Sequence, residues 1–297
     1  MVYERLKSVC DIVLKDEPMK DHTYFKIGGK ASYLVMPKSI DEIKEIIKIA
    51  KEERYPLFVI GNGSNLLVDD KGLFGIVIKI AKSFSDIRVD DNKIIASSGA
   101  LLSKIASVAC ENNLSGFEFA SGIPGTLGGA VKMNAGAYDG EIKDVVVRTT
   151  YLDKNGNVSI RQGKEHDFSY RHSIFGDEDI ILESEIVLNY GDKNKIKEKM
   201  LDLNSRRKEK QPLEYPSAGS TFKRPEGYFA AKLIDDCNLR GKKCGGAMVS
   251  EKHCGFIINY DNASFNDVIN LINEVKKVVY EKTNVVLCEE VKILKNN

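Results

Sequence analysis

Residues 121–140 read SGIPGTLGGAVKMNAGAYDG and hold the densest cluster of glycines in the chain. Glycine loses more conformational freedom on folding than any other residue. A chain therefore concentrates it where backbone must approach a ligand or another backbone closely. The spacing is too irregular for a linker, and the glycines are too many for a stable helix. The stretch predicts a ligand cradle or, alternatively, a tightly packed structural loop.

A shorter glycine segment, Gly61 to Asn65, follows the apolar run PLFVI at 56–60. Consecutive backbone amides freed by glycine can cradle a diphosphate. The segment is not a dinucleotide fingerprint, because Leu66 occupies the third glycine position, and it lacks the Gly-Lys-Ser/Thr of a Walker loop. Alone, such a loop is more often a simple turn. Together, two such segments far apart in sequence predict an extended ligand whose phosphates are held from two sides.

Helix and strand signals alternate in the first half of the chain. Residues 39–53 predict an amphipathic helix that opens with a capping box of Ser39 and Glu42, and residues 101–113 predict a second helix. Further strand signals lie at 56–60, 75–80 and 145–188. Within the last of these, Asn155-Gly156 marks a tight hairpin.

A charged helix over residues 193–212 stops at Pro212 and marks a boundary. Beyond it, helices are expected at 227–239 and after a cap formed by Ser264 and Asp267. Strand signals lie at 245–259 and 284–294. The order predicts a larger N-terminal α+β unit, residues 1–195, followed by a smaller α+β domain, residues 196–297.

The composition argues against several classes of protein. A formal net charge of +1, from 44 basic and 43 acidic residues, gives no field that attracts nucleic acid or a membrane surface. No apolar run approaches membrane-spanning length and the first residues lack a signal-peptide core, so we expect a cytoplasmic protein. The six cysteines form no Cys-x-x-Cys pair and the four histidines are dispersed. We therefore expect no metal site and free thiols.

The stretch PSAGSTFKRP, residues 216–225, is a short loop with a proline at each end. It presents the hydroxyl of Ser220 beside Gly219 and two cations, Lys223 and Arg224. Ser220 has neither the Gly-x-Ser-x-Gly setting of a hydrolase elbow nor a neighbouring His to act as base. The loop is built to hold a ligand, but its residues alone do not identify that ligand.

Two residue pairs carry chemistry of their own. Tyr170 and Arg171 lie in a predicted loop, where a lone arginine is usually a surface cation. Tyr228 and Lys232, four apart on a predicted helix, match the catalytic pair of short-chain dehydrogenases, but the N-terminal nicotinamide fold of those enzymes is absent. The alternative is that Tyr228 packs into the core while Lys232 faces solvent or a ligand phosphate.

Two adjacent acids, Glu289 and Glu290, lie in the last predicted strand. Side chains alternate along a strand, so the two carboxylates point to opposite faces, and both faces are otherwise largely apolar. One carboxylate is therefore expected to be partly buried and to need a partner. Periodicity does not say which one.

Five motifs occur in one order along the chain: Gly-Asn-Gly-Ser-Asn, Gly-Ile-Pro-Gly-x-x-Gly-Gly, Tyr-Arg, Ala-Gly-Ser-x-Phe and Glu-Val-Lys. In this order they resemble the UDP-N-acetylenolpyruvoylglucosamine reductase family of peptidoglycan synthesis, from about Thr23 to the C-terminus. The resemblance implies an α+β fold with a two-part FAD-binding domain of the vanillyl-alcohol-oxidase type, residues 1–195. Its subdomains would be roughly 1–80 and 81–195, and a smaller α+β substrate-binding domain, residues 196–297, would follow.

The resemblance also implies FAD as cofactor and NADPH as hydride donor. The substrate would be a UDP-sugar enolpyruvate, UDP-N-acetylglucosamine enolpyruvate, which is reduced to UDP-N-acetylmuramate. We expect a cytoplasmic monomer without nucleic-acid or membrane partners. The short distance from Gly219 to Asn259 resembles the shorter family subtype, which lacks an extra tyrosine-bearing loop.

The motifs carry the family's site residues onto this chain. Ser220 matches the proton donor, Arg171 the catalytic arginine and Glu290 the catalytic glutamate, which chooses between the two adjacent acids. The expected cofactor-binding residues are Gly61, Asn62, Gly63, Ser64, Asn65, Gly122, Ile123, Thr126, Gly128, Gly129, Asn134 and Gly136. The expected substrate-binding residues are Tyr170, Lys223, Arg224 and Lys232. Arg224 departs from the family pattern, which often has Asn there, so the contacts to the substrate phosphates are left open.

The implied reaction reduces an enol ether that carries a carboxylate. Hydride from the reduced flavin adds to the vinyl carbon, negative charge spreads into the carboxylate, and a proton then goes to the adjacent carbon. Arg171, always charged and forked, suits the carboxylate. Glu290 would donate to or orient the same oxygens, and Ser220 would deliver the proton.

Two other functions are weighed against this one. Another FAD enzyme of the same fold, such as an alcohol oxidase, would share the glycine segments but need not have the Ser220 loop. A module that only binds a sugar nucleotide would explain the glycines but not Arg171, Ser220 and Glu290.

Overall fold

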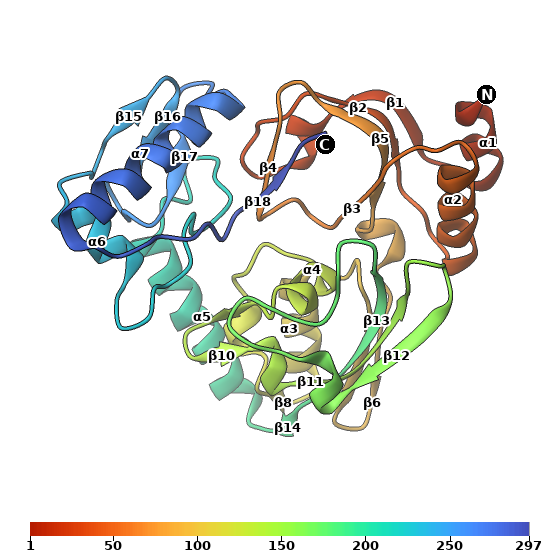
Figure 1. Ribbon diagram of the computed structural model, residues 1–297. Coiled ribbons are helices and arrows are strands. Elements are labelled where there is room, and N and C mark those ends of the chain that lie inside the picture. Colours follow the sequence, from red (N-terminus) through yellow and green to blue (C-terminus); the bar gives the residue numbers. More distant parts are fainter. Residues whose placement is uncertain (297) are drawn as a thin grey trace. The chain divides into compact units, whose positions relative to one another are not determined.

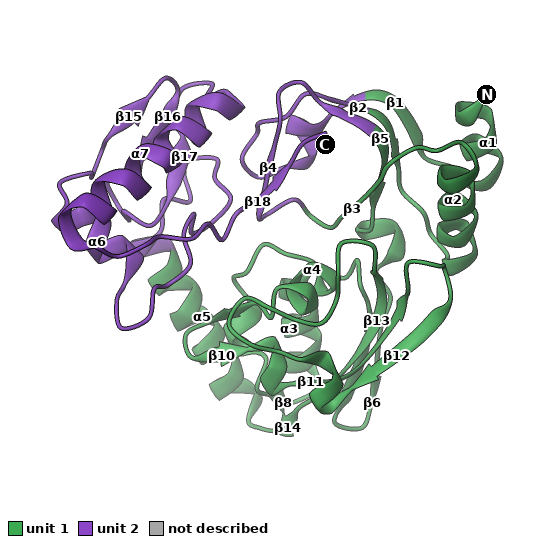
Figure 2. Cartoon of the chain, viewed as in Figure 1, with its two compact units in different colours: residues 1–16, 32–62, 75–207 green, residues 17–31, 63–74, 208–297 purple. Residues whose placement is uncertain are grey.

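The computed structural model describes residues 1–296 and groups them into two units (Figure 2). Unit 1 contains residues 1–16, 32–62 and 75–207. Unit 2 contains residues 17–31 and 63–74 together with the chain from residue 208 onward. Two early segments thus belong with the C-terminal part of the chain. The expected FAD-binding domain, residues 1–195, and substrate-binding domain, residues 196–297, are defined by function and stay predictions.

The first sheet of unit 1 has four strands in the order β1-β2-β5-β3, and β3 runs parallel to β5 (Figure 1). These strands are β1 (Val13–Pro18), β2 (Lys30–Val35), β3 (Leu57–Ile60) and β5 (Leu73–Lys79). Helices α1 (Val2–Val9) and α2 (Ile40–Glu52) bury Leu6, Ile43 and Ile46 in one core cluster with Ile76 and Ile78. Strand β3 ends directly before Gly61, where the first glycine segment begins.

The capping box predicted for α2 forms only by half. Ser39 Oγ accepts from the backbone N–H of Glu42 at 3.2 Å, as predicted. The Glu42 carboxylate, however, accepts from the backbone N–H of Lys38 at 2.9 Å instead of that of Ser39. The helix begins where the sequence placed it, because one side-chain acceptor still satisfies its first turn.

The second sheet of unit 1 is antiparallel, with five strands in the order β12-β11-β13-β7-β6 (Figure 1). Its strands are β6 (Ile87–Asp90), β7 (Lys93–Ser97), β11 (Val146–Leu152), β12 (Val158–Gln162) and β13 (Ile180–Val187). The helices of this part are α3 (Leu102–Glu111), α4 (Leu127–Lys132) and α5 (Lys193–Lys210). Leu102, Ile105 and Leu127 from α3 and α4 share a core cluster with Ile94 and Ile186 of the sheet. Two short pairs complete the unit: β8 (Leu114–Ser115) with β14 (Asn189–Tyr190), and β9 (Gly136–Ala137) with β10 (Gly140–Glu141).

The hairpin predicted at Asn155-Gly156 connects β11 and β12, with Leu152 opposite Val158. Its loop is longer than the predicted tight turn. The carboxylate of Asp153 accepts from the backbone N–H groups of Asn155 and Asn157, and Gly156 takes a left-handed φ of +83°. An aspartate that caps its own loop replaces the two-residue turn.

Unit 2 has a three-stranded antiparallel sheet of β15 (Lys243–Cys244), β16 (Ala247–Val249) and β17 (Ile257–Asn259). Its helices are α6 (Ala230–Asp236) and α7 (Phe265–Thr283). The capping box of α7 is confirmed, because Ser264 Oγ accepts from Asp267 N at 3.1 Å and Asp267 accepts from Ser264 N at 2.9 Å. Strand β4 (Leu66–Val68) pairs in parallel with β18 (Lys292–Leu294).

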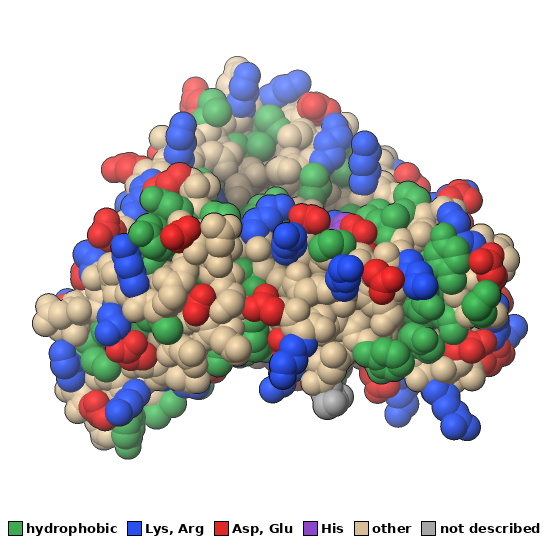
Figure 3. All heavy atoms as spheres, turned by 90° about the horizontal axis from the view of Figure 1, so that it is seen from above, with side chains coloured by type: hydrophobic (Ala, Val, Ile, Leu, Met, Phe, Trp, Pro, Cys, Tyr) green, Lys and Arg blue, Asp and Glu red, His purple; other side chains and the backbone are tan. Residues whose placement is uncertain are grey.

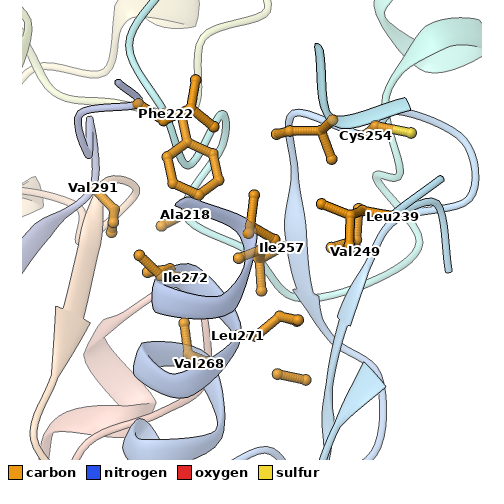
Figure 4. Close-up of a cluster of buried hydrophobic side chains, with 14 of the residues drawn as sticks. Ala218, Phe222, Leu239, Val249, Cys254, Ile257, Val268, Leu271, Ile272 and Val291 are labelled. Atoms are coloured by element: carbon orange, nitrogen blue, oxygen red, sulfur yellow. The ribbon is translucent and has the colours of Figure 1, made fainter. Parts of the chain in front are cut away.

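The core of unit 2 anchors the Ser220 loop on both sides. Ala218 and Phe222 are buried with Ile257 of β17, Ile272 of α7 and Val291 (Figure 4). Phe25, Ile27 and Leu67 from the two early segments belong to the same cluster. Ser220 thus lies between two residues whose side chains are fixed by packing.

Two sequence expectations in unit 2 are wrong. Tyr228 lies before α6 and is 50% exposed, so it neither shares a helix face with Lys232 nor packs into the core. The strand expected over 284–294 is regular only in β18, and Glu289 and Glu290 precede it. Before β18, Glu290 is bonded to Thr221 and Asn65, which are distant in sequence, and apolar periodicity does not record such bonds.

Charges of both signs are mixed on the face of the molecule seen in Figure 3, as the net charge of +1 suggests. Within residues 1–296, no helix combines the length and the apolar character that crossing a membrane requires. All six cysteines are free, and four of them are buried: Cys10, Cys110, Cys237 and Cys254.

Candidate functional site

Gly61 and Asn62, the first two residues of the first glycine segment, lie with the second glycine segment in unit 1. Asn62 Nδ2 donates to the backbone oxygen of Pro124 at 2.9 Å, across 62 positions of sequence. A Cβ added at Gly61 would collide with Thr126 Oγ1. The backbone that follows β3 therefore touches the loop that precedes α4, as a cradle shared by both segments requires.

Protein packing alone accounts for several of the glycines. A Cβ at Gly122 would collide with Asn204 of α5, and one at Gly136 would lie 2.6 Å from the backbone oxygen of Gly140. A Cβ at Gly128 would lie 2.9 Å from Ser98 Cβ. In unit 2, Gly63 has a left-handed φ of +68° and faces the backbone of His22. For these four positions the structural-loop interpretation is sufficient.

Gly129 differs from its neighbours. It is exposed in the first turn of α4, and a Cβ there would have only Thr126 Oγ1, at 3.9 Å, within ordinary contact distance. Glycine costs a helix about 0.5–1 kcal/mol relative to alanine. No contact within the described residues requires glycine at position 129. A ligand lying against the backbone there would require it, because a side chain would occupy its space.

Ser98 places a polar group next to Gly128. Its side chain is buried, and its Oγ has no hydrogen-bond partner among the described residues. The hydroxyl lies 3.6 Å from where a Cβ on Gly128 would be. Buried hydroxyls are normally paired, so this one fits a ligand oxygen or nitrogen. The open backbone at Gly129 and the unpaired hydroxyl beside Gly128 both fit the cofactor that the sequence resemblance implies.

Arg171 is held in a strained conformation at the edge of this region of unit 1. Its φ is +55°, in the left-handed region that non-glycine residues rarely occupy. Its Nη2 donates to the backbone oxygen of Gly136 at 3.3 Å, and its guanidinium lies 5.0 Å from the ring centroid of Tyr170. The structure thus brings Tyr170 and Arg171 next to the second glycine segment.

Asn134, predicted to bind cofactor, has its side chain committed to the protein. The side chain is fully buried, and its Nδ2 donates to the backbone oxygen of Ser169 at 3.0 Å and to Glu141 at 3.2 Å. Its Oδ1 accepts from the backbone N–H of Lys143 at 2.9 Å. Asn134 therefore supports the loop of Tyr170 and Arg171, and only its backbone is left for a cofactor contact.

In unit 2, the Ser220 loop is hydrogen-bonded to the segment of Glu289 and Glu290. The backbone N–H of Glu290 donates to the Thr221 oxygen at 2.8 Å, and that of Lys223 donates to the Cys288 oxygen at 2.8 Å. Gly219 has a left-handed φ of +77° that a side chain would strain. Ser220 is half-buried, and among residues 1–296 no group hydrogen-bonds to its side chain. Two motifs that are distant in sequence are therefore direct neighbours.

The two adjacent acids have different surroundings. Glu289 Oε1 forms an ion pair with Lys276 Nζ of α7 at 2.7 Å. Burial by itself would raise the pKa of Glu289, but the hydrogen bond and charge of Lys276 outweigh it, so the pKa lies below its ordinary value. Glu289 is thus explained as a structural partner of α7, although its backbone also pairs with Phe222 of the Ser220 loop. The catalytic role of Glu290 stays a prediction.

Two of the three predicted substrate-binding cations of unit 2, Lys232 and Arg224, have partners within the protein. Lys232 pairs with Asp236 at 2.9 Å, and both side chains are exposed. The guanidinium of Arg224 lies 3.8 Å from the ring centroid of Phe229, which is also exposed. Exposed pairs of this kind are weak, so a phosphate can displace them at low cost. The substrate contacts of these residues stay predictions.

Sequence reasoning missed one residue of unit 1 and one contact within unit 2. Ser98 follows β7 in the run Ser97-Ser98-Gly99, where small residues at the end of a strand are the only signal. The missed contact is a hydrogen bond from Asn65 Nδ2 to the backbone oxygen of Glu290 at 3.1 Å. The cofactor contact that the motif assigns to Asn65 stays a prediction. No local pattern reveals a bond that spans 225 positions of sequence.

Comparison with protein families matches both parts of the chain. Residues 31–160 match the family described as FAD binding domain. Residues 211–294 match the family described as UDP-N-acetylenolpyruvoylglucosamine reductase, C-terminal domain. The chain therefore carries the α+β fold that was expected, an FAD-binding domain followed by a C-terminal domain of this reductase type.

Curated relatives cover nearly the whole chain. The UDP-N-acetylenolpyruvoylglucosamine reductase of Caldanaerobacter subterraneus subsp. tengcongensis is 56% identical over 94% of this chain and 92% of its own length. That of Alkaliphilus oremlandii is 53% identical over 98% of this chain and 97% of its own length.

Solved structures agree with this assignment. The crystal structure of UDP-N-acetylenolpyruvylglucosamine reductase from Thermus caldophilus has a TM-score of 0.80 and 33% identity, and covers 96% of this chain and 98% of that one. Phl p 4.0202, a glucose dehydrogenase, has a TM-score of 0.51 at 12% identity over 65% of this chain and 44% of that one. This second likeness is one of fold alone.

Proposed function

Because the chain belongs to the UDP-N-acetylenolpyruvoylglucosamine reductase family, we propose that it reduces UDP-N-acetylglucosamine enolpyruvate to UDP-N-acetylmuramate, with NADPH as hydride donor. The chain is an FAD-dependent oxidoreductase of peptidoglycan synthesis. The proposal includes a cytoplasmic location, a monomeric state and a UDP-sugar as the small-molecule substrate. High identity over nearly the full length of both relatives supports the substrate assignment.

The residues of unit 1 that would hold FAD are Gly61, Asn62, Thr126, Gly129 and Ser98. FAD, when bound, supplies the hydride-transfer chemistry between the nicotinamide and the substrate. Support for this cradle comes from the open backbone at Gly129 and the unpaired hydroxyl of Ser98. Neither glycine segment contains a His or Cys, so we propose that these residues bind the cofactor without a covalent bond.

Arg171 would stabilise the negative charge that develops on the substrate carboxylate. An arginine guanidinium presents paired N–H donors in a planar fork that matches a carboxylate. A donor that is oriented before the reaction costs no reorganisation when charge develops. The hydrogen bond to Gly136 and the contact with Tyr170 support such an orientation.

Ser220 would deliver the proton to the substrate carbon, and Glu290 would orient the same region of the substrate. A serine hydroxyl is a weak acid in water, but it serves when the accepting carbon is strongly basic and lies in contact with it. The observation that carries this assignment is the backbone bond between Thr221 and Glu290, which makes neighbours of two sequence-distant motifs.

Ser220→Ala tests the proposal by separating the two half-reactions. Reduction of the enzyme by NADPH needs no proton donor to carbon, so its rate should stay near that of the wild type. Reoxidation by the enolpyruvyl substrate should slow by about 10²–10⁴-fold, the usual cost of losing a positioned acid. Ser220→Cys should recover part of the rate, because a thiol occupies the same place and donates.

Stopped-flow absorbance measures both half-reactions on one sample. Equal slowing of reduction and reoxidation in Ser220→Ala would mean that the serine only shapes its loop. A wild-type rate of reoxidation would remove Ser220 from the mechanism.

A further inference from the structure

Asn65 holds the segment that carries Glu290, and the contacts lie wholly within unit 2. Its Nδ2 donates to the backbone oxygen of Glu290 at 3.1 Å. Its own backbone oxygen accepts from the backbone N–H of Lys292 at 2.9 Å. One residue thus binds the chain at two points, one on each side of Val291.

The side-chain bond from Asn65 takes the place of a missing ladder bond. Regular parallel pairing of β18 with β4 begins only at Lys292, opposite Leu66. Glu290 lies before this ladder, so β4 supplies no backbone donor for its carbonyl group. The amide of Asn65, one residue before β4, supplies that donor instead.

The other peptide group of Glu290 is held by the Ser220 loop. Its N–H donates to the backbone oxygen of Thr221 at 2.8 Å. Thr221 is in turn fixed, since its N–H donates to the oxygen of Gly255 and its Oγ1 accepts from the N–H of Ile257 at 3.0 Å. With both peptide groups of Glu290 bound, the direction of its Cα–Cβ bond relative to Ser220 is set.

We propose that Asn65 is a positioning residue for Glu290: its side-chain amide fixes that glutamate beside Ser220 for the proton-transfer half of the reaction. The inference rests on the role of Glu290 in the proposed function. It gives the last residue of the first glycine segment a task different from the cofactor contact that the motif predicts. One Nδ2 hydrogen bond and the backbone oxygen of Asn65 serve contacts within unit 2.

The bond to Glu290 requires a donor on the side chain of residue 65. The NH2 group of asparagine provides that donor, 3.1 Å from the carbonyl oxygen of Glu290. In Asn65→Asp, a carboxylate oxygen of nearly the same shape would face the Glu290 carbonyl and repel it. In Asn65→Ala, the carbonyl would lose its partner and the segment before Lys292 would gain freedom.

The test compares half-reactions in the FAD-loaded enzyme. Asn65→Ala and Asn65→Asp should keep their flavin and be reduced by NADPH at a rate close to that of the wild type. Reoxidation by the enolpyruvyl substrate should slow by about 10-fold or more, since a displacement near 1 Å at a reacting group costs on the order of 10²-fold. In the Glu290→Gln background, adding Asn65→Ala should slow reoxidation little further, because the positioned group is already disabled.

Asn92→Ala is the matched control. Asn92 Nδ2 also donates to a backbone oxygen, that of Leu188 at 2.9 Å, in a partly buried setting between β6 and β7 of unit 1. The loss of an amide–carbonyl bond there should leave both half-reactions unchanged. Thermal unfolding of every variant shows whether the fold is intact, and Asn65→Asp preserves side-chain shape if Asn65→Ala does not fold.

Three results would overturn the inference. The first is loss of flavin from the Asn65 variants combined with normal reoxidation of the fraction that retains it, which would make Asn65 a cofactor contact. The second is a multiplicative effect in the double variant, which would make Asn65 independent of Glu290. The third is normal reoxidation in Asn65→Ala while Glu290→Gln is slow, which leaves the proposed function intact. Normal reoxidation in Glu290→Gln itself would overturn the catalytic assignment and the inference together.

Discussion

At the scale of the residue, Gly128 and Gly129 are adjacent in sequence and opposite in environment. A Cβ on Gly128 would press against Ser98, whereas one on Gly129 would enter open space. The sequence predicted the glycine segment but treated its glycines alike, because composition does not record what each Cα faces. At Gly129, a side chain would therefore stabilise the helix but would obstruct the cofactor proposed to lie against it.

Gly129→Ala should stabilise the protein without FAD and weaken FAD binding. An alanine in the helix raises the free energy of unfolding of the apoprotein by about 0.5–1 kcal/mol, because it restricts the unfolded chain. The same methyl group would occupy the space proposed for the cofactor. Thermal unfolding of the apoprotein and a fluorescence titration with FAD measure the two effects.

Gly128→Ala is the control, since its clash with Ser98 should lower the stability of the apoprotein. An unchanged FAD affinity in Gly129→Ala would exclude this face of α4 from the cofactor site.

At the scale of the element, a short 3-10 turn, Gly163–His166, is locked onto the second sheet of unit 1 by a buried histidine. His166 Nδ1 lies 2.9 Å from the backbone oxygen of Gly163, which can only accept, so Nδ1 carries the proton. Nε2 lies 3.0 Å from Thr149 Oγ1, and Thr149 Oγ1 lies 3.0 Å from Ser184 Oγ, so in a neutral ring Nε2 accepts from the Thr149 hydroxyl. The ring also stacks on Phe168 at 4.7 Å between centroids. Burial favours the neutral imidazole, which this chain of hydrogen bonds accommodates.

Acid should weaken the fold through His166. Burial lowers the pKa of His166, as it favours the neutral ring, while Glu165 acts in the opposite direction and Arg161 in the same one. The unfolded histidine has a pKa of about 6.5, so below that pH the unfolded state binds more protons and the free energy of unfolding falls. Above about pH 6.5 the contribution is complete, and it is lost as pH falls toward the folded pKa.

Urea unfolding between about pH 5 and 7 measures this effect against His166→Gln, which cannot titrate. The variant should show a smaller decrease in stability with falling pH, by up to about 1.4 kcal/mol per pH unit. His253, whose pKa burial also lowers, keeps part of the slope in both proteins. Identical slopes would show that His166 does not titrate differently in the folded and unfolded states.

Elements with strong local signals were predicted well. Ser264 and Asp267 fix the start of α7, and Pro212 limits α5, because caps and prolines act on their own turn. The segment before β18 was predicted poorly, because Thr221 and Asn65, both distant in sequence, hold Glu290 in place of a ladder. A helix cap depends on residues within one turn and can be read from the local sequence. A hydrogen bond between residues distant in sequence cannot.

At the scale of the whole molecule, the sequence did not predict that residues 17–31 and 63–74 belong to the same unit as the chain from residue 208 onward. Phe25, Ile27 and Leu67 lie far from residue 208 in the chain, yet they share one core with Leu271 and Ile272 of α7. No composition shift marks residues 17–31 or 63–74 as parts of unit 2. The five motifs predicted the fold class nonetheless, because their order along the chain resembles one family whose fold is known.

A fragment starting at residue 208 should not fold by itself. It would lack the buried side chains of Phe25, Ile27 and Leu67 and the β4 partner of β18. Loss of one large buried side chain costs roughly 2–5 kcal/mol, and an ordinary domain has only about 5–15 kcal/mol in total. Near-ultraviolet circular dichroism during heating should show a cooperative transition for the full chain and none for the fragment. A cooperative transition in the fragment would mean that the early segments are dispensable.

The hydrogen bond between Asn65 and Glu290 can form only late during synthesis on the ribosome. The two residues are 225 positions apart, so Asn65 leaves the exit tunnel long before its partner has been translated. At about 5–20 residues per second, the delay is on the order of 10–45 s. During that time Phe25, Ile27 and Leu67 are exposed on the nascent chain, and they are targets for chaperones that recognise apolar segments. Unit 1 can condense while translation continues, whereas unit 2 has to wait for the last strand.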